Sequence, residues 1–219
     1  MTQLAIDLPF LPAYGRADFL VSGCNAAALA RIDSWPDWPG RALVLHGPAG
    51  SGKSHLAQLW RERSGATLIA GEALAKHDPS ALAASPGVVV DDAERASEQA
   101  LLHLFNCSRE SGAGQLIIAR AASAIWPIAL PDLASRLRAT ETVGIGPPDD
   151  SLLAAVLVKH FADRQLRVEP EIIAYLVPRM ERSFAAATAL AARLDRLALI
   201  AKRPVGLALA RQALAELGG

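Results

Sequence analysis

A glycine-rich turn between an apolar run and a helical pattern constrains the fold of this chain more than any other stretch. Residues 43–45 form the apolar run, His46 and then three glycines within six positions follow, and Lys53 and Ser54 end the turn. Glycine backbones can curl so that successive N–H groups point inward, and a helix that begins near Gly52 adds its positive N-terminal end. We therefore predict a strand, a phosphate-binding loop and a helix in succession.

The spacing G-x-x-x-x-G-K-[ST] assigns chemistry to this turn. The Lys53 ammonium is expected to reach the β- and γ-phosphates of a nucleotide, and the Ser54 hydroxyl to ligate Mg²⁺. The alternative is a glycine turn with a chance lysine, which leaves the flanking strand and helix unexplained. The predicted nucleotide-binding residues are Gly47, Pro48, Ala49, Gly50, Ser51, Gly52, Lys53, Ser54 and His55.

Composition narrows the classes of fold and partner. Hydrophobic residues make up 52% of the 219 residues and aromatic residues only 5%, so the core must be mainly aliphatic, which favours helices around a buried sheet. Lys plus Arg equals Asp plus Glu at 22 each, which argues against strong DNA binding by the chain itself. No apolar run approaches the roughly 18 residues of a membrane span, and no signal-peptide pattern is present. We expect a cytoplasmic protein.

Short apolar runs alternate with helical patterns along the first two thirds of the chain. The predicted strands cover 42–46, 67–70, 87–90, 115–119 and 140–145. The predicted helical segments cover 25–34, 55–63, 98–107 and 131–138, and 71–84 is predicted as helix and loop. We expect Asn25 and Ser97 to cap two of these helices. This alternation predicts an α/β fold with a five-stranded sheet.

Two adjacent carboxylates follow the valine run 88–90. Carboxyl ends of parallel strands are where α/β proteins bind ligands, so Asp91 and Asp92 are expected beside the phosphate-binding loop. There Asp91 would hold Mg²⁺ through water, and Asp92 would polarise an attacking water. A plain turn is the alternative interpretation of an Asp-Asp pair.

The pattern becomes entirely helical after the break Gly146-Pro147-Pro148. Four helical segments are predicted, at 150–162, 169–176, 183–201 and 205–217. We expect a tail over 1–12, an α/β nucleotide-binding domain over 13–146 and an all-α domain over 147–219.

The N-terminal tail alternates apolar and other residues. In an extended backbone Leu4, Ile6 and Leu8 share one face, while Gln3 offers a directional hydrogen bond. Docking into a partner's groove and an edge strand or disordered end are both compatible with this pattern.

Three motifs stand in the order of a known superfamily: Gly-Lys-Ser-His-Leu at 52–56, Val-Asp-Asp at 90–92 and Leu-Ala-Ser-Arg-Leu at 133–137. They resemble the DnaA branch of the AAA+ ATPases, and the resemblance extends from Asp18 to Leu217. It implies an AAA+ P-loop NTPase fold, with a five-stranded parallel sheet flanked by helices and a small all-α lid, and it implies ADP or ATP with Mg²⁺ as cofactor.

With its short tail, the chain is similar to the Hda family of DnaA regulators. This resemblance implies that DnaA is a partner and that Arg136 is an arginine finger, which reaches into a neighbouring subunit's nucleotide site. Asp92 and Arg136 are therefore the predicted catalytic residues, each at a different nucleotide. The resemblance does not decide whether the chain forms a homodimer. The resemblance also implies that the tail binds the sliding clamp, which is the β subunit of DNA polymerase III. The clamp-binding residues would be Gln3, Leu4, Ile6, Asp7 and Leu8.

Two positions depart from the DnaA pattern. Ala121 stands where a polar sensor residue is expected, with Arg120 as a substitute, and Ala185 stands where the lid usually supplies an arginine, with Arg182 as the alternative. These departures predict weak hydrolysis of the chain's own nucleotide and action on a nucleotide held by the partner. The rival interpretations are a helicase loader of the DnaC type and a non-catalytic scaffold that nucleotide stabilises.

Overall fold

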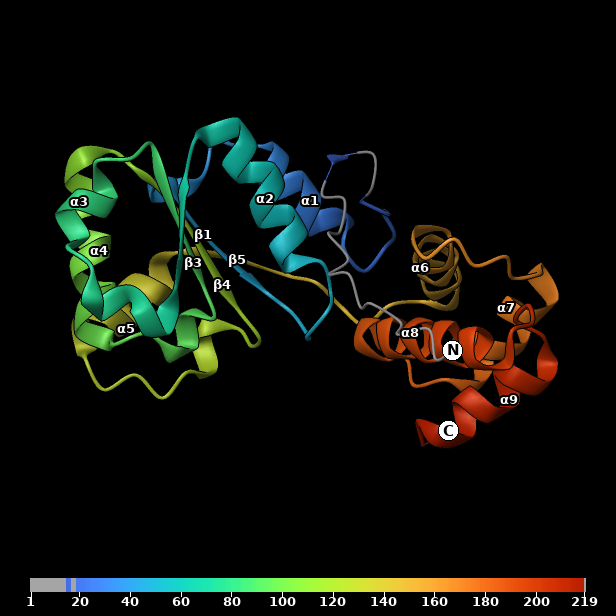
Figure 1. Ribbon diagram of the computed structural model, residues 1–219. Helices are drawn as coiled ribbons and strands as arrows, with labels where there is room; N and C mark the ends of the chain where they lie inside the picture. Colours follow the sequence, from blue (N-terminus) through green and yellow to red (C-terminus); the bar gives the residue numbers. More distant parts are fainter. Residues whose placement is uncertain (1–14, 17–18, 219) are drawn as a thin grey trace, which may run out of the picture.

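The computed structural model describes residues 15–16 and 19–218 (Figure 1). The predicted clamp-binding residues Gln3, Leu4, Ile6, Asp7 and Leu8 lie outside the described residues, so their role stays a prediction.

The five strands form one parallel sheet in the order β2-β3-β4-β1-β5. Their bounds are Ala42–His46 for β1, Thr67–Ala70 for β2, Gly87–Asp91 for β3, Gly114–Ala119 for β4 and Glu141–Gly144 for β5. The central strands β1, β3 and β4 are almost completely buried, as is typical of parallel strands covered on both faces. The predicted five-stranded parallel sheet is confirmed.

Helices cover both faces of this sheet (Figure 1). Helices α1 (Ala26–Asp33) and α2 (Lys53–Ser64) cover one face, whereas α4 (Glu98–Ser111) and α5 (Pro131–Ala139) cover the other. Successive residues of β1 serve the two sides: Leu43 packs with Trp60 of α2, and Val44 packs with Leu101 of α4. This alternation follows from the two-residue period of a strand.

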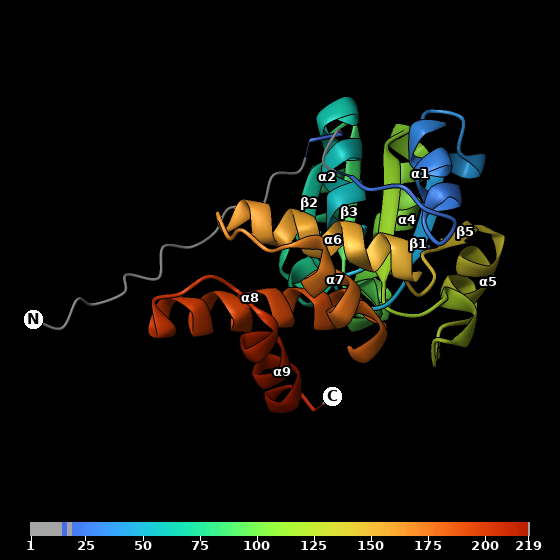
Figure 2. The same cartoon turned by 90° about the vertical axis from the view of Figure 1, so that its right-hand side faces the viewer.

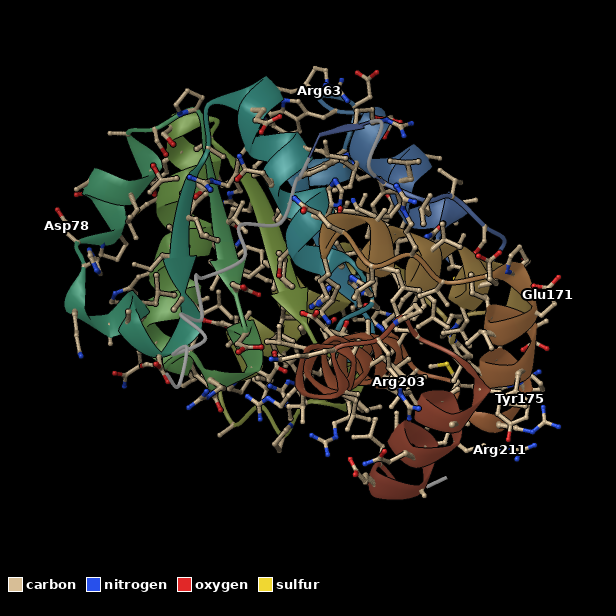
Figure 3. The ribbon with its side chains drawn as sticks, turned by 45° about the vertical axis from the view of Figure 1, so that its right-hand side comes forward. Arg63, Asp78, Glu171, Tyr175, Arg203 and Arg211 are labelled. Atoms are coloured by element: carbon tan, nitrogen blue, oxygen red, sulfur yellow. The ribbon has the colours of Figure 1, made fainter. Side chains whose placement is uncertain are left out.

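The segment predicted as helix and loop over 71–84 contains two short helices. A 3-10 helix, η3 (Gly71–Lys76), comes first and the short helix α3 (Pro79–Ala83) follows. Asp78, which Figure 3 labels, lies just before α3. Its carboxylate accepts a hydrogen bond of 3.0 Å from the backbone N–H of Ser80 and so caps the start of α3.

Asn25 and Ser97 stand at the expected N-cap positions, yet neither side chain caps its helix. The Asn25 side chain instead accepts from the Ser22 N–H at 2.8 Å and donates to the Leu20 carbonyl at 2.8 Å. Asn25 therefore shapes the segment before α1, and the prediction of side-chain capping at both positions is wrong.

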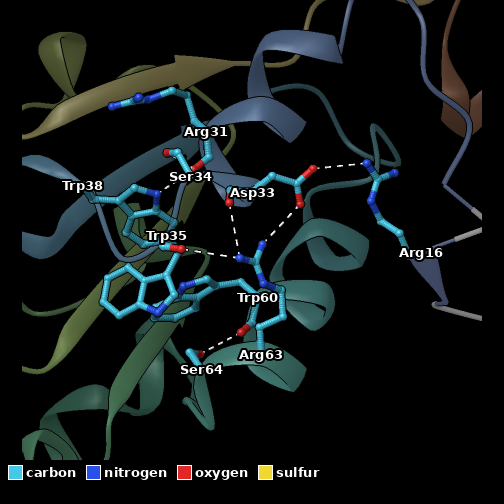
Figure 4. A network of polar contacts seen from close by, with 9 residues as sticks. All are labelled: Arg16, Arg31, Asp33, Ser34, Trp35, Trp38, Trp60, Arg63 and Ser64. Atoms are coloured by element: carbon cyan, nitrogen blue, oxygen red, sulfur yellow. Dashed lines mark hydrogen bonds and ion pairs between the residues drawn. The ribbon is translucent and has the colours of Figure 1, made fainter.

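Three tryptophans pack together beside the sheet (Figure 4). Trp38 stacks on Trp60 with ring centroids 5.0 Å apart, and Trp35 meets both rings edge-on. The Trp38 indole N–H donates to the Arg31 carbonyl at 2.6 Å. Trp35 also lies directly over Gly114, where no side chain would fit.

The remaining helices form a second, helical part with its own core (Figure 2). They are α6 (Asp150–Asp163), α7 (Pro170–Leu176), α8 (Phe184–Ala201) and α9 (Leu207–Glu216). The side chains of Asp149 and Ser183 cap α6 and α8. Short 3-10 helices occur at Pro39–Arg41 (η2), Ala93–Arg95 (η4), Ser123–Ile125 (η5) and Val177–Arg179 (η6).

Among the residues that the structure describes, no helix combines the length and apolar character that a membrane span requires.

A glycine substitution tests the packing of Trp35. A Cβ on Gly114 would overlap the Trp35 indole, so Gly114→Ala should lower the free energy of unfolding by about 1–3 kcal/mol, the usual cost of overpacking. Chemical denaturation followed by tryptophan fluorescence measures the change. A Cβ on Gly23 would meet no heavy atom within 4 Å, so Gly23→Ala should change stability by less than about 0.5 kcal/mol. Equal losses in both variants would contradict this packing.

Candidate nucleotide site

The phosphate-binding loop joins the carboxyl end of β1 to α2. Gly50 and Gly52 adopt left-handed φ angles of 73° and 94°, which favour glycine. Gly47 is confined by space: a Cβ there would lie 2.9 Å from the Ile145 carbonyl oxygen and 3.0 Å from Ser51 Oγ. The glycines therefore permit a tight turn against β5 that other residues would obstruct.

Lys53 is folded into this loop. Its side chain is 9% exposed, and its Nζ donates to the carbonyls of Gly47 at 2.7 Å and Pro48 at 2.8 Å. Burial lowers the pKa of Lys53, while the negative charges of Asp91 and Asp92 act in the opposite direction. The ammonium is thus held at the loop with its charge poorly hydrated. An anion bound there interacts with this charge more strongly than it would in water.

Ser51 and Ser54 occupy different environments in the loop. Ser51 Oγ is buried and has no hydrogen-bond partner among the described residues. A buried hydroxyl without a partner is costly, and a ligand with oxygen acceptors would satisfy it. Ser54 begins the exposed side of α2, where its hydroxyl is accessible to a metal ion.

Asp91 and Asp92 lie at the same sheet edge as the loop. Asp91 is the last residue of β3, and β4 alone separates β3 from β1. Burial raises the pKa of Asp91, and its Oδ1 accepts the Asp92 N–H at 3.0 Å. Asp92 has a left-handed φ of 48°, which turns the chain sharply at the end of the strand. The structure thus brings this pair into the electrostatic range of Lys53.

Arg120 stands beside Asp92 at the end of β4. Its Nε lies 3.9 Å from Asp92 Oδ1, and its backbone N–H donates to Glu94 Oε1 at 3.0 Å. Ala121 follows and has no polar side chain; its carbonyl accepts from the Trp126 indole at 3.1 Å. The residue before this expected sensor position, Arg120, therefore directs a guanidinium toward Asp92.

The first turn of α8 rests on the phosphate-binding loop. A Cβ on Gly50 would lie 3.2 Å from the Ala185 backbone nitrogen and 3.3 Å from Phe184 Cβ. Arg182, the alternative candidate, instead pairs with Asp150 Oδ1 at 2.7 Å. The helical part thus presents an alanine and a phenylalanine to the loop, and the nearby arginine is engaged within the helical part.

A cavity of about 340 Å³ adjoins the loop between the two parts of the chain. Its walls are mainly apolar and include Leu20, Val156 and Phe184, with the polar pair His160 and Thr188. The Thr188 hydroxyl donates to the Phe184 carbonyl at 3.0 Å, so at its 3.1 Å contact with His160 Nε2 the imidazole is the donor. Sequence reasoning missed these residues, because they come from three separated segments with no local motif.

The residues present fit a nucleotide. The loop and Lys53 would hold its phosphates, and the apolar cavity beside them has the volume and lining for a base. Ser54 and Asp91 would hold Mg²⁺, which neutralises charge on the phosphates when bound. The described residues contain no cluster of three or more His, Cys, Asp or Glu that could hold a metal. Phosphates and water would therefore supply the remaining ligands, as is usual for Mg²⁺.

Arg136 is not brought to this site. It lies in α5, near the start of β5, whereas the loop follows the end of β1. The two strands are parallel neighbours, so Arg136 belongs to the opposite sheet edge, about 13 Å away along β1 at 3.3 Å per residue. Among the described residues its guanidinium has no hydrogen bond or ion pair.

Lys53 offers a direct test of the site. We expect Lys53→Ala to weaken ADP binding about ten- to a hundredfold, because it removes the charge-assisted contacts to the phosphates. Titration with a fluorescent ADP analogue measures this. Lys76→Ala removes an equal charge from the exposed side of η3 and serves as the control. Wild-type affinity in Lys53→Ala would show that the nucleotide binds elsewhere.

His160 should make stability depend on pH. Burial lowers the pKa of His160 from its ordinary value of 6.5, and the charge of Arg164 adds to this effect. As the pH falls through this range, the unfolded chain takes up a proton that the folded chain resists, so the free energy of unfolding decreases. We expect the thermal midpoint to fall from about pH 7.5 to about pH 5.5, and less steeply in His160→Gln.

The control for this pH series is His103→Gln, because His103 is exposed on α4. Its thermal midpoint should follow the wild-type dependence. Identical slopes for the wild type and His160→Gln would contradict a contribution from His160.

No protein-family model matches this sequence. The chain is similar to the chromosomal replication initiator protein DnaA of Thermomicrobium roseum, at 25% identity over 236 aligned residues that cover 94% of this chain and 50% of that protein. The DnaA of Magnetococcus marinus is 24% identical over 237 aligned residues, which cover 94% of this chain and 52% of that protein. The chain thus spans about half the length of these initiators.

Solved structures show the same relation in three dimensions. Domain III of Thermotoga maritima DnaA aligns with a TM-score of 0.80 and 18% identity, covering 95% of this chain and 98% of that one. AMPPCP-bound DnaA from Aquifex aeolicus aligns with a TM-score of 0.67 and 18% identity, and the alignment covers 86% of this chain and 67% of that one. The Thermotoga maritima RuvB branch migration motor aligns with a TM-score of 0.69 and 14% identity, and the alignment covers 95% of this chain and 74% of that one.

These alignments confirm the fold that the motifs implied. The chain has the AAA+ P-loop NTPase fold; it is similar in sequence to the DnaA initiators and in structure to domain III of Thermotoga maritima DnaA.

Proposed function

We propose that the protein is a nucleotide-binding regulator of replication initiation, as in the Hda family. In this proposal the protein presents Arg136 to ATP held by DnaA and promotes hydrolysis of that ATP. The observation that carries this proposal is the position of Arg136. It is half-buried, has no ion pair among the described residues, and stands at the sheet edge opposite the phosphate-binding loop. A guanidinium in that position serves a neighbouring subunit, where it would stabilise charge on the transferred phosphate.

The chain's own site supports binding more than hydrolysis. Lys53, Ser54 and Asp91 offer the groups that hold ADP or ATP with Mg²⁺. Ala121 and Ala185, however, stand at the two positions where DnaA-like proteins use polar or cationic sensors. In the proposal, nucleotide on this loop keeps the α/β part and the helical part in the arrangement that a partner recognises.

The homologous half of the DnaA initiators suggests the partner. The chain is similar in structure to domain III of DnaA, and in the proposal it binds DnaA through its AAA+ domain. The tail from Gln3 to Leu8 would bind the sliding clamp and so hold the chain close to DNA. The chain's formal charge of zero does not favour direct DNA binding.

The test measures conversion of DnaA-bound ATP to ADP in the presence of DNA-loaded clamp. Wild-type protein should accelerate the conversion, and Arg136→Ala should reduce this acceleration by about 10³-fold, the effect of losing an arginine finger. Arg138→Ala is the matched control, because Arg138 lies exposed on the same helix. Both variants should bind ADP as the wild type does. Full acceleration by Arg136→Ala would remove Arg136 from the mechanism.

Deleting residues 1–8 separates docking from chemistry in the same assay. The shortened chain should lose clamp binding and the acceleration that depends on it, while its ADP affinity stays at the wild-type level. Acceleration by neither the wild type nor any variant would favour a non-catalytic scaffold.

A further inference from the structure

A second cavity, of about 200 Å³, lies at the sheet edge opposite the phosphate-binding loop. The first residue of β1 and the start of β4 reach this edge, and the cavity draws its lining from η2, α4 and α5 as well. Two buried polar side chains lie in its wall: Gln115 Nε2 donates to Ser108 Oγ at 3.1 Å, and the two residues are 2% and 3% exposed. Three arginines line the same cavity: Arg41, Arg109 and Arg136.

None of these arginines is neutralised within the described residues. The guanidinium groups of Arg41, Arg109 and Arg136 take part in no ion pair or hydrogen bond there. Glu141, which begins the adjacent strand β5, is already bound to Arg31. Three like charges around one small cavity repel one another, and an anion between them would remove that repulsion.

Arg41 is held in place by its own local structure. It follows Gly40 in η2, and both residues have left-handed φ angles, 61° for Gly40 and 57° for Arg41. Such a conformation is costly for a residue with a side chain and tends to occur at ligand-binding positions. The Arg41 guanidinium also lies over the Trp35 ring, 4.8 Å from its centroid. Stacking of this kind restricts a guanidinium while leaving its N–H edge available.

We propose that Arg41, Arg109 and Arg136 together form a phosphate-binding site, which receives the terminal phosphates of a nucleotide held by a neighbouring AAA+ subunit. A terminal phosphate matches this cavity because it carries up to two negative charges and three acceptor oxygens, and planar guanidinium groups bind such oxygens in pairs. The identity of the donor rests on the proposed function. The site itself rests on the arginine cavity.

The proposal adds two residues to the one that the motif identified. Arg136 is the finger of the proposed function, whereas Arg41 and Arg109 come from segments far from it in sequence. Their role is to bind the same phosphate and to keep Arg136 directed at it. Loss of either should therefore lower the rate of hydrolysis on the partner without affecting the chain's own nucleotide site, which lies at the other sheet edge.

Anion binding is tested first with the full chain alone. The chain is saturated with ADP and Mg²⁺, so that its phosphate-binding loop is filled, and is then titrated with inorganic pyrophosphate in a calorimeter. The wild type should bind pyrophosphate at a further site, and Arg41→Ala, Arg109→Ala and Arg136→Ala should each weaken this binding about tenfold. Arg138→Ala should leave it unchanged. Added salt should weaken it in every case, because Arg41 and Arg109 are exposed and Arg136 is half-buried.

The hydrolysis assay with DnaA and DNA-loaded clamp distinguishes the source of the phosphate. Arg41→Ala and Arg109→Ala should each reduce the acceleration of hydrolysis about tenfold, and Arg138→Ala should not. No pyrophosphate binding in the ADP-saturated wild type, or equal weakening by Arg138→Ala, would overturn the site. Normal acceleration by Arg41→Ala and Arg109→Ala would overturn its assignment to a neighbour's nucleotide.

The two proposals fail in different ways. If the wild type does not accelerate hydrolysis at all, the proposed function is wrong, and pyrophosphate binding still decides whether the arginine cavity is a phosphate site. If only Arg136→Ala lowers the acceleration, the proposed function stands, and the assignment of the three-arginine site to a neighbour's nucleotide is wrong.

Discussion

The position of the phosphate-binding loop depends on hydrogen bonding of β1 to a strand on each side. β4 and β5 hold β1 in register along its length, so the chain leaves the sheet after His46 at a defined point. The Gly47 N–H continues this pairing to the Ala119 carbonyl at 3.2 Å, and the Ile145 N–H donates to the His46 carbonyl at 2.8 Å. The loop is therefore built on rigid backbone, and Asp91 and Arg120 reach its vicinity because their strands end at the same edge.

Local patterns were sufficient to predict the sheet and the loop. The apolar runs gave strand positions within one or two residues, because buried parallel strands require continuous aliphatic sequence, and the Gly-Lys-Ser spacing identified the turn. Interactions between distant segments could not be predicted in this way. Asn25 binds backbone before its helix in place of capping it, and His160 meets Thr188 only because α6 and α8 pack together. The three-arginine cavity likewise combines segments that no motif links.

The departures at Ala121 and Ala185 gain meaning from their surroundings. Arg120 lies beside Asp92, and so this end of β4 is not without charge. At α8 the situation differs, because Phe184 and Ala185 lie beside Gly50 while Arg182 is bound to Asp150. The helical part therefore contacts the loop by shape and not by charge. Such contact responds to whether the loop and cavity are filled more than to which phosphate is present.

The opposite placement of the two phosphate-directed features gives the molecule a polarity. One sheet edge holds the loop of the candidate nucleotide site, and the other holds the arginine cavity. Two copies that meet through these unlike edges are related head to tail, as in a heterologous interface, and each contact leaves one edge of each kind exposed at the two ends of the row. A symmetric pair joined by like edges would bring two loops or two arginine cavities together. An assembly that uses this chemistry is therefore directional, and a subunit at either terminus differs from all the others in which edge it leaves exposed.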